Sequence, residues 1–223
     1  MSVWAIVAAA GRGDRLGLDR PKAFAALRGR PLLAESLERL EATDWVDAIV
    51  VVAPEGWEEP AILLAEELGC GKVSTCVTGG ATRAESVRLA LGEVPEDVAV
   101  VLVHDAARPL VTEETVARVL APLVEGWDGA VPGLPLADTV KRVIGDAVVE
   151  TVPRDDFVAV QTPQAFVAPV LRRAVAAGED ASDCAGLVER AGGRVKVVPG
   201  DPRLLKVTDA GDLERVERLL AEA

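Results

Sequence analysis

The sequence contains no tyrosine and no asparagine, only two glutamines and a single histidine, His104. Few thermolabile amides together with 14 prolines are typical of thermophilic proteins, although a GC-rich genome produces the same bias. The chain also lacks an apolar run of about eighteen residues, which argues against a membrane span. Its first residues, 1–7, carry no basic segment and indicate a buried strand rather than a signal peptide, so we expect a cytoplasmic protein.

Cysteine is scarce as well, and Cys70, Cys76 and Cys184 show no metal-ligand spacing, so we expect free thiols that serve packing. The charge is unbalanced: 24 basic and 36 acidic residues give −12, which argues against nucleic-acid binding because that needs a basic surface. Any site for an anionic ligand must therefore gather positive charge locally. Half of the 223 residues are hydrophobic, which is enough for one core, and we expect one domain spanning 1–223.

Short runs rich in valine and isoleucine alternate with segments of helical periodicity, which predicts an α/β, three-layer Rossmann-like fold with a mostly parallel sheet. The runs are nearly continuous in apolar residues, as in strands buried on both faces. The predicted strands lie at 3–9, 48–53, 73–77, 98–103 and 194–198. The predicted helices lie at 31–42 with Pro31 at the first helical position, 57–68, 82–91, 112–125 capped by Thr112, 168–177, 182–191, and from Asp209 onward. In such folds ligands bind outside the carboxyl ends of the strands.

The alternation is interrupted between residues 134 and 157. Two β-type segments, 139–144 and 147–152, flank Gly145-Asp146, a plausible two-residue turn, and predict a β-hairpin. An exposed hairpin is unstable alone, so we expect the segment 136–156 to project as an arm that packs on a partner subunit. The sequence therefore predicts a homodimer.

A glycine-rich loop follows the first predicted strand, with the order G-x-G-x-x-x-G from Gly11 to Gly17. This order is one residue longer than the dinucleotide fingerprint, and no G-K-[ST] follows as in a P-loop. Four cations stand in the eleven residues from 12 to 22, namely Arg12, Arg15, Arg20 and Lys22. Glycine N–H groups and clustered cations favour a phosphate site, although a solvated charge run is the alternative.

Three further segments carry chemistry. The glycine loop from Thr78 to Val87 enters a helix with a hydroxyl cap, which suits a base or ribose. Asp105 ends the fourth strand beside the phosphate site and is a candidate magnesium ligand or hydroxyl acceptor, whereas His104 is expected to be a structural hydrogen-bonding residue. Lys206 precedes the last helix and is expected to converge on the same site.

Together these segments resemble the 2-C-methyl-D-erythritol 4-phosphate cytidylyltransferase family of the non-mevalonate isoprenoid pathway. The matching pieces run in order from residue 9 to residue 208: A-A-G-R-G-D-R-L, P-K, G-G-A-T-R-A-E-S-V, V-H-D-A-A-R-P, D-T-V-K-R, T-P-Q-A-F and K-V-T. The resemblance implies a transferase that joins CTP to methylerythritol phosphate, releases pyrophosphate and uses magnesium. It also implies a homodimer.

The resemblance further implies roles for single residues, all numbered in this sequence. The implied catalytic cations are Arg15, Lys22 and Lys206. The implied nucleotide-binding residues are Ala9, Ala10, Gly11, Gly13, Gly80, Arg83 and Ser86. The implied acceptor-binding residues are Asp105, Arg108, Thr139, Arg154 and Ser182, with Thr139 and Arg154 reaching the site from the partner's arm and Asp105 also a candidate for the metal.

Three other functions are weighed against this one. A related cytidylyltransferase acting on another polyol phosphate, such as ribitol 5-phosphate, would share the fold, the cations and the CTP loop. An NAD-dependent oxidoreductase requires the tighter glycine fingerprint and an acid after the second strand, a position near which only Glu55 lies. A module that only binds nucleotides has less need of three converging cations.

Overall fold

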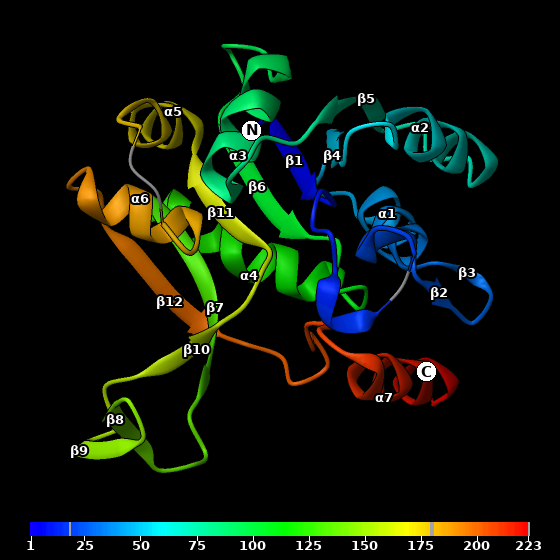
Figure 1. The fold of residues 1–223 in the computed structure, drawn as a ribbon. Helices are drawn as coiled ribbons and strands as arrows, with labels where there is room; N and C mark the ends of the chain where they lie inside the picture. Colours follow the sequence, from blue (N-terminus) through cyan, green and yellow to red (C-terminus); the bar gives the residue numbers. More distant parts are fainter. Residues whose placement is uncertain (18, 179–180, 223) are drawn as a thin grey trace.

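An eight-stranded sheet forms the centre of the molecule in the computed structural model, which describes residues 1–17, 19–178 and 181–222 (Figure 1). The strand order is β10-β7-β11-β6-β1-β4-β5, and β12 pairs with β7. Four strands form the parallel part: β1 (Val3–Ala8), β4 (Ala48–Ala53), β5 (Val73–Thr78) and β6 (Val100–Asp105). The predicted α/β class and these strands are confirmed, with bounds that differ by at most two residues.

The other half of the sheet is mixed. β11 (Gln164–Val167) runs antiparallel between β6 and β7 (Gly129–Pro135), and β10 (Val158–Val160) is antiparallel to β7. β12 (Val195–Pro199) pairs with β7 in parallel and confirms the predicted strand at 194–198. The strands β7, β10 and β11 were not predicted from the sequence, because β7 contains two prolines and two glycines and the other two are very short.

Helices cover both faces of the sheet. The helices α1 (Leu32–Ala42), α2 (Glu58–Glu67) and α4 (Glu113–Val124) contribute to one apolar cluster. The helices α3 (Arg83–Glu93), α5 (Ala168–Ala176) and α6 (Cys184–Arg190) contribute to the cluster on the opposite face. The last helix, α7 (Ala210–Ala221), packs Val216 in a third cluster at the end that carries the site. The predicted three-layer arrangement is therefore confirmed.

The predicted helix caps are observed, but two predicted helix starts are wrong. Thr112 Oγ1 accepts from Thr115 N, and Asp209 Oδ1 accepts from Asp212 N. Pro31 is not the first residue of α1: it pairs in the short ribbon β2–β3 (Ala26–Leu27, Arg30–Pro31), and its ψ of 139° is extended. The helix expected from residue 182 begins at Cys184, because Asp183 is the residue that caps it, through Gly186 N.

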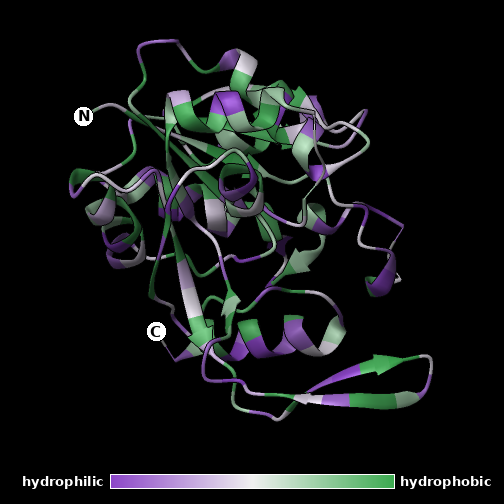
Figure 2. Ribbon diagram, turned by 90° about the vertical axis from the view of Figure 1, so that its left-hand side faces the viewer, coloured by the Kyte–Doolittle hydropathy of each residue, from purple (hydrophilic) through white to green (hydrophobic). Residues whose placement is uncertain are grey.

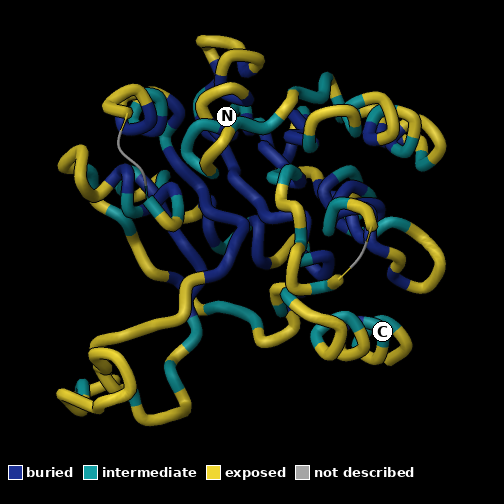
Figure 3. Tube along the Cα trace, viewed as in Figure 1, coloured by how far each residue is buried: buried dark blue, intermediate teal, exposed yellow. Residues whose placement is uncertain are grey.

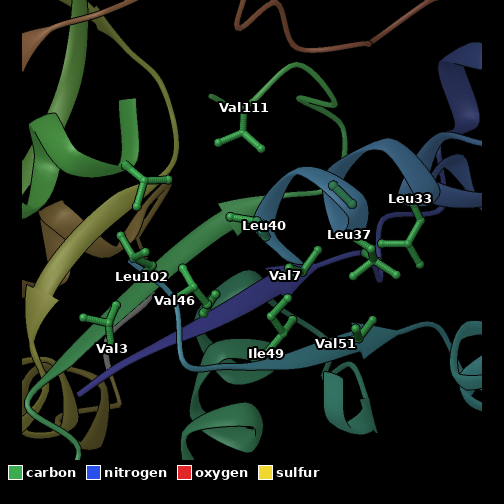
Figure 4. Packing of buried hydrophobic residues seen from close by; sticks show 14 of the residues in the cluster. Val3, Val7, Leu33, Leu37, Leu40, Val46, Ile49, Val51, Leu102 and Val111 are labelled. Carbon is green, nitrogen blue, oxygen red and sulfur yellow. The ribbon is translucent and has the colours of Figure 1, made fainter. Parts of the chain in front are cut away.

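Alternation along the parallel strands divides the core between the two faces. On β1, Val3 and Val7 join the cluster beneath α1, whereas Ile6 joins the cluster on the other face. Figure 4 shows Leu33, Leu37 and Leu40 of α1 packed with these strands. All of these side chains are buried, and Figure 3 shows the buried trace concentrated in the sheet.

The predicted hairpin is present as β8 (Val140–Ile144) and β9 (Ala147–Val152), with Gly145 at φ 57° in the turn. It forms a separate two-stranded sheet that projects from the body, with its trace largely exposed (Figures 1–3). Its exposed apolar side chains include Val143, Ile144 and Val148. Within the described ranges, no helix is long and apolar enough to cross a membrane.

Phe166 gives a direct test of the mixed half of the sheet. Its ring is fully buried, and a Cβ on Gly129 would lie 2.6 Å from it, so the site has no spare volume. We expect Phe166→Ala to lower the free energy of unfolding by about 3–5 kcal/mol and Phe166→Leu by clearly less. Urea denaturation measures both, with Leu63→Ala, at a half-exposed position, as the control. A loss for Phe166→Ala no larger than that of the control would contradict this packing.

Candidate active site

The candidate site lies where the strand order reverses. β1 has β4 on one side and β6 on the other, so the connections leave in opposite directions at the carboxyl ends of β1 and β6. Ala8 and Asp105, the last residues of these strands, are paired in register. A cleft of about 560 Å³ opens there. A cleft therefore lies at the carboxyl ends of the strands, where the sequence predicted a ligand site.

Six segments line this cleft. Its lining residues are Ala8, Ala9, Ala10, Gly11, Arg12, Lys22, Ala23, Val52, Gly80, Ala81, Thr82, Arg83, Ser86, Asp105, Ala106, Ala107 and Lys206. Four of them are cations, Arg12, Lys22, Arg83 and Lys206, and one is a carboxylate, Asp105. A chain of net charge −12 therefore presents a positive cleft, which favours a polyanionic ligand.

The glycine-rich loop folds back onto Lys22. The loop contains a short 3₁₀ turn, Asp14–Leu16, and Lys22 begins a second one, Lys22–Phe24. Gly13 has φ 76°, and a Cβ on it would lie 2.6 Å from Lys22 Cβ, so only glycine fits there. Lys22 N also donates to Gly11 O at 3.3 Å. The spacing of the glycines therefore serves to place the Lys22 side chain under the loop.

Lys22 is largely buried, and its surroundings disfavour its charge. Burial lowers the pKa of its ammonium group, and the neighbouring charge of Lys206 lowers it further, while Asp105 opposes this. Arg15 and Arg108 also lower the Lys22 pKa by their charge. An anionic ligand in the cleft relieves this repulsion, so the structure is prepared for negative charge beside Lys22.

The loop between β5 and α3 is held by its own side chains. Thr82 Oγ1 caps α3 by accepting from Glu85 N, and Glu85 Oε2 accepts from Ala81 N at 2.8 Å. Ser86 Oγ accepts from Gly80 N at 3.0 Å and donates to Thr82 O at 2.9 Å. The loop is therefore held by hydrogen bonds of its own before any ligand arrives, which suits a preorganised binding site.

Asp105 joins two of the cations. Its Oδ1 accepts from Arg83 Nη2 at 3.2 Å and its Oδ2 accepts from Lys206 Nζ at 2.7 Å. Burial opposes ionisation, but the charges of Arg83 and Lys206 hold the pKa of this carboxyl well below its usual range. Arg83 is also bound on its other side, where Nη1 donates to Cys184 Sγ at 3.2 Å. Asp105 thus fixes the positions of Arg83 and Lys206 across the cleft.

Comparison with known proteins identifies the family. The model of the 2-C-methyl-D-erythritol 4-phosphate cytidylyltransferase (IspD) family matches residues 3–222. The chain belongs to this family. Relatives with that name from Frankia casuarinae and Saccharopolyspora erythraea are each 48% identical, covering 98% and 99% of this chain and 81% and 100% of theirs. The crystal structure of the Thermus thermophilus cytidylyltransferase is 36% identical, with a TM-score of 0.79 over 97% of this chain and 98% of that one.

Most of the residues predicted for a cytidylyltransferase site gather in the cleft, and the others lie outside its lining. Those in the cleft are Lys22, Lys206, Ala9, Ala10, Gly11, Gly80, Arg83, Ser86 and Asp105. Gly13 packs on Lys22, and Arg15 is exposed outside the lining but close enough to affect Lys22 by its charge. Arg108 is outside the lining, where Nη1 donates to Leu204 O at 2.7 Å, but its charge also affects Lys22. Ser182, Thr139 and Arg154 are exposed outside the lining, and Arg154 donates to Ala137 O.

The sequence analysis assigned no role to several residues that build the site. Gln161 Nε2 donates to Asp201 O at 2.9 Å and its Oε1 accepts from Asp201 N at 3.0 Å, which holds the turn leading to Lys206. Thr162 Oγ1 accepts from Asp105 N at 3.0 Å. The only signal in the sequence was the T-P-Q-A-F motif, which begins at Thr162 and does not include Gln161.

The residues of the cytidylyltransferase cleft do not fit a resident magnesium ion. Asp105 is the one carboxylate among the described residues that line the cleft, and both of its oxygens already accept from cations. Among the residues that the structure describes, no group of three histidine, cysteine, aspartate or glutamate side chains is placed to hold a metal. Magnesium prefers several oxygen ligands in octahedral geometry, which this site does not provide by itself.

The only histidine generates a pH prediction. Burial lowers the pKa of His104 from 6.5 to about 4. Between these values the unfolded chain binds a proton that the folded chain does not, so the free energy of unfolding decreases as the pH falls from 6.5 to 4. His104 should contribute a slope of up to about 1.4 kcal/mol per pH unit in this window. Urea denaturation of wild type and His104→Gln from pH 7 to 4 measures it, and parallel curves for the two proteins would refute the assignment.

Proposed function

We propose that this chain catalyses the reaction of CTP with 2-C-methyl-D-erythritol 4-phosphate, which yields the cytidine diphosphate of methylerythritol and pyrophosphate. Membership of the family and the names of relatives at 48% identity over nearly the whole chain support this reaction. The observation that carries the proposal from the structure is the cleft itself. Lys22, Arg83 and Lys206 come from distant segments and meet there beside a preformed base loop.

CTP binds with its two ends in different parts of the cleft. The loop 78–87 receives the cytosine and ribose. Its glycines allow a ligand to lie close to the backbone, and the hydroxyl of Ser86 is already held by hydrogen bonds to Gly80 N and Thr82 O. The triphosphate lies along the glycine loop, where Arg12 and Lys22 supply positive charge. Arg15, exposed on the same loop, is placed to reach the outer phosphates.

The reaction is an in-line displacement at phosphorus. An oxygen of the methylerythritol phosphate forms a bond to the α-phosphorus of CTP, and the bond from that phosphorus to the β-phosphate oxygen breaks, which releases pyrophosphate. No proton needs to be removed from the attacking phosphate, because it is already ionised at neutral pH. The protein therefore contributes position and positive charge rather than covalent chemistry.

Lys22 and Lys206 serve opposite sides of this displacement. Lys22 neutralises the charge that develops around the α-phosphate, and its depressed pKa indicates how strongly it benefits from an anionic neighbour. Lys206 is held by Asp105 and lies near enough to act on Lys22 by its charge, and in this proposal it orients the phosphate of the acceptor. This arrangement brings two anionic substrates together against their mutual repulsion.

The competing functions receive less support. The relatives are named for methylerythritol phosphate, which favours this acceptor over ribitol 5-phosphate. An NAD-dependent oxidoreductase is disfavoured by the family and by the cationic glycine loop. A module that only binds has no need for the ion-paired Lys206.

In this proposal the protein itself provides no magnesium site, and the ion would be brought to the cleft as part of the CTP substrate. Asp105 does not serve as its ligand, because its two oxygens hold Arg83 and Lys206. When bound, the ion would neutralise part of the negative charge of the triphosphate.

We also propose that the enzyme acts in the cytoplasm, where CTP is available.

We further propose that residues 1–223 form one catalytic domain from which the arm, 136–156, reaches a second subunit. The hairpin exposes Val143, Ile144, Val148 and Val149, with 45–66% of each side chain accessible. Such a group of apolar side chains on a projecting ribbon fits burial in a dimer. Thr139 and Arg154 flank the hairpin and would then reach the partner's acceptor site.

The nucleotide and cation assignments are tested by pyrophosphate release with magnesium, methylerythritol phosphate and each of the four nucleoside triphosphates. CTP should support turnover and the others should not. Lys22→Ala should lower kcat/KM about a hundredfold or more, since it removes a charge donor from the reacting phosphate, and should leave the fold intact. Arg30→Ala, a cation paired with Glu38 on the surface, is the control. Normal turnover by Lys22→Ala, or release with none of the nucleotides, would refute the proposal.

The arm is tested by the oligomeric state. We expect the wild type to be a dimer of the 23.3 kDa chain in light scattering, and the double variant Val143→Asp, Val148→Asp to be a monomer with strongly reduced turnover. Both positions are exposed, so the variant should retain the circular dichroism of the wild type. Leu63→Asp, at a half-exposed position on α2, is the matched control and should remain dimeric. A monomeric wild type, or a double variant that stays dimeric, would contradict the role of the arm.

A further inference from the structure

A buried polar pair lies directly behind the cleft and has no part in the chemistry described above. His104 is fully buried at the end of β6, and Thr162, on the segment leading to β11, is 4% exposed. Neither residue lines the cleft. The distance between His104 Nδ1 and Thr162 Oγ1 is 3.2 Å, and Thr162 Oγ1 in turn accepts from the backbone N–H of Asp105 at 3.0 Å.

The hydrogen-bond partners determine where the protons lie. His104 Nε2 is 3.1 Å from the carbonyl oxygen of Arg108, and because a carbonyl only accepts, Nε2 carries the ring proton. Burial keeps the ring neutral, so Nδ1 is an acceptor. The hydroxyl of Thr162 therefore donates to Nδ1, which leaves its lone pairs facing the N–H of Asp105.

The same histidine spans the turn that follows Asp105. Arg108 N donates to Asp105 O at 2.9 Å, and His104 Nε2 holds the carbonyl of Arg108 from behind. The backbone of Asp105 is thus held at its N–H through Thr162 and at its carbonyl through the turn. Its carboxylate then extends into the cleft between Arg83 and Lys206.

We propose that His104 and Thr162 are positioning residues that fix the Asp105 carboxylate, and through it Lys206 and Arg83, for the transfer reaction. This inference rests on the proposed function. A hydroxyl suits the task because it accepts from Asp105 and donates to His104 at the same time, which neither valine nor alanine does. If the Asp105 carboxylate moved, the hydrogen bond from Lys206 Nζ to Asp105 Oδ2, now 2.7 Å long, would be weakened or lost.

The first test removes the hydroxyl of Thr162 with little change of shape. We expect Thr162→Val to lower kcat about tenfold to a hundredfold, whereas Thr162→Ser, which keeps the hydroxyl, should retain kcat within about twofold. The matched control is Ser36→Ala, because Ser36 is also fully buried and its hydroxyl donates to Ala106 O, one residue beyond Asp105. This control should lose a similar amount of thermal stability and keep its kcat. An equal kcat for Thr162→Val and Ser36→Ala would overturn the inference.

A double-mutant cycle shows whether Thr162 acts through Lys206. In a Lys206→Met background, whose residual turnover remains measurable, Thr162→Val should have little further effect on kcat, because the cation that it positions is already absent. Multiplicative effects of the two substitutions would overturn the proposed route.

Two replacements of His104 distinguish the contributions of its two ring nitrogens. Asparagine retains an acceptor near the position of Nδ1 and glutamine retains a donor near the position of Nε2. We expect His104→Asn to keep more turnover than His104→Gln, since the link to Asp105 passes through Nδ1 and Thr162. The reverse order would contradict this.

Amide hydrogen exchange tests the positioning without relying on turnover. The N–H of Asp105 should exchange slowly in the wild type and Thr162→Ser and at least about tenfold faster in Thr162→Val, because its acceptor is gone. Unchanged protection of Asp105 in Thr162→Val would overturn the inference even in an active enzyme. A wild type that is inactive with CTP but shows the expected exchange pattern would refute the proposed function and leave the positioning of Asp105 intact.

Discussion

The ion pairs of Asp105 are the interaction on which the site depends. This one carboxylate, 11% exposed, accepts from Arg83, which is 22 residues away in the sequence, and from Lys206, which is 101 residues away. Removing either cation would leave this nearly buried carboxylate with less compensation of its charge, so its ion pairs constrain the geometry more than pairs between two exposed side chains do. The end of β6, the start of α3 and the segment that precedes α7 are thereby held together around one cleft.

The parallel half of the sheet was predictable because short stretches of sequence contain the features that determine its strands and helix starts. β1, β4 and β6 are continuous apolar runs that suit strands covered on both faces, and the caps Thr112 and Asp209 stand at the observed helix starts. The antiparallel half was not predictable in this way. β7 includes Pro132 and Pro135, and its prolines are tolerated by tertiary pairing with β10, β11 and β12 that no short window of sequence contains.

The residues of the site also differ in whether local sequence was enough to predict them. Lys22 and the base loop were predictable because glycines, hydroxyls and cations stand close together in the sequence, and the structure adds the reason for Gly13, which is the contact with Lys22. The hydrogen bond of Arg108 was not predictable from its motif. Its guanidinium donates to the carbonyl of Leu204, and only the fold brings residue 204 beside it. Gln161 and Thr162 act through backbone groups in the same way, which leaves no signature in composition or spacing.

The account centres on a positive cleft in an acidic chain, built to hold the triphosphate of CTP beside a second phosphate. A crystal structure with bound CTP tests this claim most directly. It should show the cytosine against the loop 78–87 and the α-phosphate beside Lys22, with the Asp105–Lys206 pair retained on the opposite wall. Nucleotide bound elsewhere on the molecule, or a triphosphate that does not contact Lys22, would contradict the account.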